Sequence, residues 1–69
     1  MDVYVKFRLG DWIVPSKLAV EKGVLRREIV GIVVGFGRDS SMSFVRVRHD
    51  GSRWVTRYHM DFWDVATNG

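Results

Sequence analysis

The chain has 69 residues, no cysteine and a formal net charge of +3, with 46% apolar and 28% charged residues. A chain of this length forms one small domain that buries only about 60% of its unfolded surface. The lack of cysteine excludes disulfide frameworks, thiolate metal sites and thiol nucleophiles. The apolar stretches are too short to span a bilayer, and the first residues lack the pattern of a secretion signal. We expect a soluble, cytoplasmic single domain that covers residues 1–69.

Apolar and polar residues alternate with a period of two along much of the chain, which predicts strands. A leading strand is predicted within residues 1–9. A turn at residues 10–11 separates it from a second strand at residues 12–14, which a proline and a serine end. Residues 16–27 leave two alternatives open: one helical turn capped by Gly23, or a long irregular loop with apolar anchors.

The middle of the chain predicts a buried strand and then a loop. Residues 28–36 are nearly all apolar and rich in β-branched side chains, which is typical of a strand buried on much of both faces. Gly31 and Gly35 within it indicate a bend, a bulge or a close backbone approach. Residues 37–43 are polar and predict a loop.

A hairpin and a short closing segment follow. Two strands, at residues 44–48 and 53–58, flank Asp50-Gly51, and this dipeptide between two β-type runs is the strongest short-range hairpin signal. We then expect one 3₁₀ turn at residues 59–62, in which His59 and Asp61 cap or hydrogen-bond the turn. A short strand at 63–66 and a tail at 67–69 complete the chain.

This order of elements resembles the SH3-like small β-barrel, a fold shared by Tudor-like and KOW-like modules and by small phage and bacterial proteins. The resemblance covers residues 9–66 and rests on two pieces of sequence: Gly10-Asp11, and residues 45–51 followed by residues 58–63. It implies an all-β barrel of five to six strands across residues 10–66. The fold alone implies no particular function, because it supports many unrelated activities.

A tight turn at Asp50-Gly51 predicts the register of the hairpin, with Arg48 opposite Arg53. Side chains alternate between the two faces of a strand. One face then holds Val45, Val47, Trp54, Thr56 and Tyr58, and this apolar set must face the interior. The other face holds Phe44, Arg46, Arg48, Arg53, Val55 and Arg57, and the four arginines share the outer side of the hairpin.

An outward stripe of arginine with an aromatic ring favours nucleic acid as the partner. Guanidinium groups bind phosphates, and a ring stacks on an unpaired base. The predicted nucleic-acid-binding residues are Arg38, Phe44, Arg46, Arg48, Arg53 and Arg57. One alternative is that these arginines only keep the face soluble, some of them paired with Asp39, Asp61 or Asp64. Another is a protein-interaction or assembly module that uses aromatic residues and an open strand edge to bind an acidic protein or a second copy of the chain.

Other chemistries find little support in the sequence. The glycines near residues 31–37 end a strand without a following helix, so a dinucleotide-binding loop is not expected. The spacing of His59, Asp61 and Asp64 does not by itself converge three metal ligands. The serines fall in predicted loops, and no serine–histidine–aspartate arrangement is suggestive. We predict a non-catalytic protein with no cofactor, no metal, no membrane partner and no small-molecule substrate.

One further resemblance points to an enzyme. Type B dihydrofolate reductases are short SH3-like chains that assemble as tetramers around a shared pore. Their sequence pattern resembles this chain at Gly10-Asp11, at residues 29–31 and at residues 55–58. Thr56 stands where that family has a ligand-binding glutamine, and Arg57 replaces an isoleucine. The resemblance implies a tetrameric reductase as a remote alternative.

Overall fold

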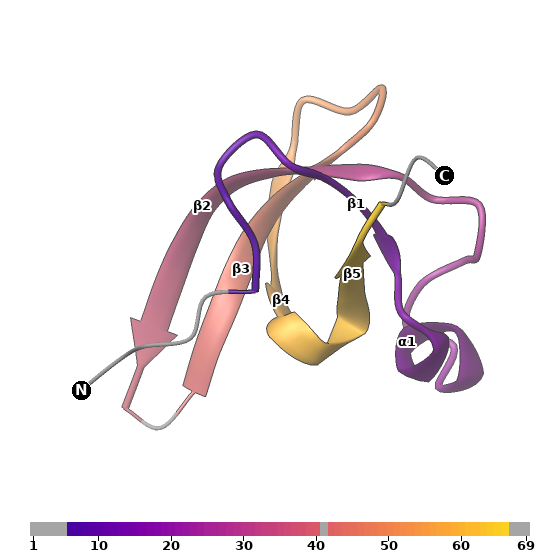
Figure 1. Ribbon diagram of the computed structural model, residues 1–69, viewed down its shortest axis with the longest axis horizontal. Helices are drawn as coiled ribbons and strands as arrows, with labels where there is room; N and C mark the ends of the chain where they lie inside the picture. The colour runs from indigo at the N-terminus through magenta and orange to yellow at the C-terminus, as the bar shows by residue number, and fades with distance from the viewer. Residues whose placement is uncertain (1–5, 41, 67–69) are drawn as a thin grey trace.

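The computed structural model describes residues 6–40 and 42–66, and it is mostly β-structure. Five antiparallel strands form one sheet in the order β4-β3-β2-β1-β5, as Figure 1 shows. The strands are β1 (Trp12–Pro15), β2 (Gly31–Asp39), β3 (Met42–His49), β4 (Val55–His59) and β5 (Trp63–Val65). The predicted 3₁₀ turn before the last strand is confirmed at Met60–Phe62. Within the described residues, β4 and β5 are the two edges of the sheet.

The strands β2 and β3 form a long two-stranded ribbon that extends past the rest of the sheet (Figure 1). The prediction of a loop at residues 37–43 is therefore wrong for most of that segment, because β2 continues to Asp39 and β3 begins at Met42. Polar side chains suit this part of the ribbon, since it projects beyond the core and both of its faces meet water. The polar residues of this segment therefore reflect the exposure of the strands to water, and not an irregular backbone.

The two ends of the chain leave part of the prediction outside the described residues. Residues 1–5 of the predicted leading strand and the tail at 67–69 lie there. Residues 6–8 have no regular secondary structure, and a turn follows at Leu9-Gly10. The backbone then joins the sheet, because the Gly10 N–H donates to the Val33 carbonyl at 2.8 Å and the Val33 N–H to the Asp11 carbonyl at 3.0 Å.

The helical alternative for residues 16–27 is confirmed by the short helix α1 (Lys17–Glu21). Ser16 caps it, since the Ser16 hydroxyl accepts from the Ala19 N–H at 3.2 Å. The helix ends before Gly23, whose φ of +72° is a conformation that favours glycine. The described residues contain no helix that is long and apolar enough to cross a membrane.

The core lies between the sheet, α1 and the 3₁₀ turn. Its buried side chains are Phe7, Ile13, Ala19, Leu25, Val33, Val45, Val47 and Trp63. Trp63 is the largest of them and has no exposed surface. The absence of a side chain at Gly31 makes room for this packing, because a Cβ atom there would lie 2.5 Å from Val47 Cγ1 and 3.2 Å from the Trp63 ring.

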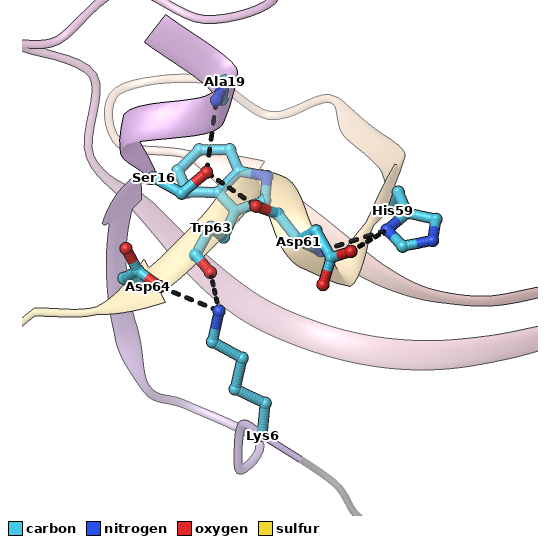
Figure 2. A network of polar contacts seen from close by, with 7 residues as sticks. All are labelled: Lys6, Ser16, Ala19, His59, Asp61, Trp63 and Asp64. Carbon is cyan, nitrogen blue, oxygen red and sulfur yellow. Dashed lines mark hydrogen bonds and ion pairs between the residues drawn. The ribbon is translucent and has the colours of Figure 1, made fainter. Parts of the chain in front are cut away.

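Polar contacts hold the 3₁₀ turn and β5 against the rest of the molecule (Figure 2). The Ser16 hydroxyl donates to the Asp61 carbonyl at 2.6 Å, which ties the turn to the start of α1. His59 Nδ1 accepts from the Asp61 N–H at 3.1 Å, so the predicted hydrogen bonding of this turn by His59 is confirmed. On the other side of β5, Lys6 Nζ donates to the Trp63 carbonyl at 2.6 Å and to the Asp64 carboxylate at 2.8 Å.

Candidate nucleic-acid interface

The hairpin of β3 and β4 pairs two residues away from the predicted register. Arg48 lies opposite Val55 instead of Arg53, and Arg46 lies directly opposite Arg57. The turn explains the shift. The Ser52 N–H donates to the His49 carbonyl at 2.9 Å, and Gly51 has a φ of +83°, while Asp50 has no positive φ.

This geometry is that of a type II turn, which does not match the twist of a two-residue hairpin. A type I′ turn would need positive φ at both central residues, whereas a type II turn splays the flanking strands. The chain therefore runs on through Arg53 and Trp54 before pairing begins again at Val55. A shift by two residues leaves every side chain of β4 on its original face, because the alternation has a period of two.

The outer face of the hairpin consequently keeps most of the predicted set. Phe44, Arg46, Arg48 and Arg57 lie on it, and Val45 and Val47 between them are fully buried on the inner side. Trp12 lies on the same outer face two strands away, since it pairs with Ile32 and Ile32 pairs with Arg48. Half of the Trp12 surface is exposed.

Three residues do not take their predicted places. Trp54 was expected to face the interior, which is wrong: 75% of its surface is exposed, in the loop between β3 and β4. Arg53 lies in the same loop and is exposed, so it is not the partner of Arg48. Arg38 pairs with Ser43, one residue from Phe44, and the alternation of side chains therefore puts Arg38 on the opposite face of the ribbon.

Two glycines of β2 form the floor under the outer-face side chains. A bulge between Val33 and Gly35 shifts the register, as the glycines of this strand predicted, and it brings Gly35 opposite Arg46 and Gly37 opposite Phe44. A Cβ atom at Gly35 would lie 3.3 Å from Arg46 Cδ, and one at Gly37 would overlap the Phe44 ring. The Phe44 ring and the Arg46 stem therefore lie across bare backbone.

Phe44 also has a cationic neighbour. The Arg57 guanidinium carbon lies 4.9 Å from the centre of the Phe44 ring, which is a cation–π distance. The Phe44 ring is thus partly covered, whereas a simple stacking platform would have a fully exposed ring. Phe44 and Arg57 instead form a cation–π pair, and a planar guanidinium is itself a surface on which a base can stack.

The cations of this face have no carboxylate partner within the described residues. The ion pairs found there join Lys6 to Asp64 and Lys17 to Glu21, and a contact of 3.6 Å joins His59 to Asp61. Arg48 donates to the Ser52 carbonyl at 3.2 Å, which leaves its positive charge uncompensated. In particular, the expected pairing of outer-face arginines with Asp61 or Asp64 is not present in this part of the chain.

A hollow of about 250 Å³ lies at the end of this face. It is lined by Asp39, Met42, Phe44, Arg57, Tyr58 and His59. It forms because β4 ends at His59, opposite Phe44, whereas β2 and β3 extend further as a ribbon. The sequence did not indicate Met42 and His59 as site residues, since the two-residue shift that brings His59 opposite Phe44 depends on the conformation of the turn.

Comparison of the chain with protein-family models, with curated proteins and with solved structures finds no match.

Proposed function

We propose that the protein is a non-catalytic module that binds nucleic acid weakly and largely without sequence preference through the outer face of β3 and β4. The observation that supports this most is the group of Arg46, Arg48 and Arg57 on one face, without a carboxylate partner in the described residues. Guanidinium ions bind phosphate oxygens through strong, charge-assisted hydrogen bonds, and a nucleic acid presents such oxygens at regular intervals. Phe44 and Trp12 add apolar rings at two sides of the same face.

We also propose that the sheet is an SH3-like small barrel. The strand order β4-β3-β2-β1-β5, the long segment between β1 and β2 and the 3₁₀ turn before β5 support this assignment. In such a barrel the outer hairpin face is a continuous surface that is open to a polymer. The fold supplies a rigid support for the arginines and carries no function on its own.

The salt dependence of binding tests the proposed function. We expect a labelled single strand to bind at low salt, with a logarithmic affinity that falls linearly with the logarithm of salt concentration. The double substitution Arg46→Ala with Arg57→Ala removes two phosphate contacts, and for a single strand it should flatten this slope by about 1.4. Fluorescence anisotropy at several salt concentrations measures the slope.

A matched control separates local contacts from net charge. Arg26 and Arg27 are exposed between α1 and β2, and replacing both with alanine changes the net charge by the same amount. This control should keep most of the slope. An equal loss of slope in both double variants would contradict a site on β3 and β4, and no binding to any nucleic acid at low salt would refute the function itself.

A second candidate function is protein interaction, and the exposure of Trp54 favours it. A tryptophan with 75% of its surface in water, next to an edge strand, is a natural interface anchor. Light scattering and capture experiments distinguish this function, because a tryptophan-centred complex should persist in high salt. The reductase alternative would require a tetramer and oxidation of NADPH by dihydrofolate.

A further inference from the structure

We infer that the hollow at the end of the outer face binds one unpaired nucleobase that carries an amino group. This single contact adds a preference for cytosine over thymine, and for single strands over duplex, to phosphate binding that is otherwise independent of sequence. This inference rests on the proposed function and specifies what its site recognises. The hollow has about 250 Å³ and opens beside the arginines that would hold the phosphates. In a duplex the amino group and both faces of a base are already occupied by its pairing partner and its neighbours, so a paired base offers these residues little to bind.

Two parts of the lining are suited to contact with the face of a base. The first is the cation–π pair of Phe44 and Arg57, with 4.9 Å between ring centre and guanidinium carbon. The second is Met42, which also lines the hollow, is 53% exposed and has a flexible, polarisable side chain. Single-stranded bases stack on aromatic rings and on guanidinium planes in this manner.

Besides Arg57, the hollow has two polar side chains that are suited to the edge of a base, Asp39 and His59. Asp39 lines the hollow, and its carboxylate would repel a phosphate but accept a hydrogen bond from an exocyclic amino group. Cytosine presents such a donor, whereas thymine presents a carbonyl oxygen and a methyl group at the same position. His59 adds a donor, because its Nδ1 accepts from the Asp61 N–H and the neutral ring then carries its proton on Nε2.

The test compares ligands that share one phosphate backbone. Labelled oligo-dC, oligo-dT and an abasic strand of about 12 nucleotides each are titrated by fluorescence anisotropy, with a duplex of equal length as a fourth ligand. We expect oligo-dC to bind most tightly, and the abasic strand at least about fivefold more weakly than oligo-dC, as the loss of one stacked base implies. Met42→Ala should reduce this difference without changing the salt slope.

Asp39→Asn is the second variant, with Asp50→Asn as its matched control. Both substitutions remove one exposed negative charge, but Asp50 lies in the loop after β3, outside the hollow. Asp39→Asn should bring the affinities for oligo-dC and oligo-dT closer together, whereas Asp50→Asn should leave their ratio unchanged.

The outcomes separate this inference from the proposed function. Equal affinity for oligo-dT, oligo-dC and the abasic strand, with a salt slope that still depends on Arg46 and Arg57, would overturn the base site and leave the phosphate-binding face intact. Equal affinity for oligo-dC and oligo-dT in the unmodified protein, both above the abasic strand, would overturn the role of Asp39. No binding by any strand would overturn both proposals.

Discussion

Replacing Gly31 with alanine should destabilise the protein because the space beside it is already filled. The new Cβ atom would lie 2.5 Å from Val47 Cγ1 and 3.2 Å from the Trp63 ring, and both neighbours are fully buried. Overpacking of this kind lowers the free energy of unfolding by about 2 kcal/mol, and the lower conformational entropy of the unfolded chain with alanine offsets about 0.5 kcal/mol of that loss. The net loss of about 1.5 kcal/mol is a large fraction of the stability of a domain this small.

Urea unfolding followed by circular dichroism measures this loss, which should lower the midpoint by about 1 M. The matched control is Gly35→Ala, where the added Cβ atom meets only the flexible, exposed Arg46 stem at 3.3 Å. A second variant tests the contact itself: Val47→Ala removes Cγ1, so adding Gly31→Ala to it should cost little more. Equal stability of the two glycine variants, or additive losses at Gly31 and Val47, would refute the packing argument.

Two further predictions concern aromatic residues. Burial raises the pKa of the Tyr58 hydroxyl above its ordinary value of 10.0, and the hydrogen bond from Thr56 opposes this rise by a smaller amount. The unfolded chain therefore loses the Tyr58 proton at a lower pH than the folded protein does. The free energy of unfolding should therefore fall as the pH rises above about 10, and it should fall more steeply than in Tyr58→Phe. Urea midpoints measured across this pH range test the difference, and an equal fall in both proteins would contradict it. Trp54→Ser should change the free energy of unfolding by less than about 0.5 kcal/mol, whereas Trp63→Phe should lower it by more than about 1 kcal/mol. A larger loss for Trp54→Ser than for Trp63→Phe in urea unfolding would contradict the assignment of Trp54 to the surface and Trp63 to the core.

The sequence predicted the faces of the hairpin better than its pairing. The alternation of residues 44–48 and 55–58 determines which side chains share a side, and an even register shift does not change that. The shift itself depends on the φ of Asp50, which the dipeptide Asp-Gly leaves open between turn types. Trp54 was misplaced for this reason, because it was assigned to a strand and lies in the loop.

The floor beneath the outer face was only partly predictable. Gly35 indicated a bulge or a close backbone approach, and the register shift between Val33 and Gly35 bears this out. Gly35 and Gly37 consequently lie under Arg46 and Phe44. This placement follows only when the pairing of β2 with β3 is known, so the sequence of one strand alone does not predict it. Short-range signals performed well where one residue acts locally, as at Gly23 after the helix.

The position of Arg57 has a consequence for solubility. It is the middle residue of β4, which forms one edge of the described sheet, and an exposed edge is a template for fibril growth. If two copies paired antiparallel about the centre of this strand, the twofold axis would set Arg57 against Arg57, and like charges placed directly opposite oppose such pairing. The same guanidinium that would attract a polyanion thus opposes edge-to-edge aggregation, and a neutral residue at this position would leave the β4 edge open to pairing with another copy of the chain.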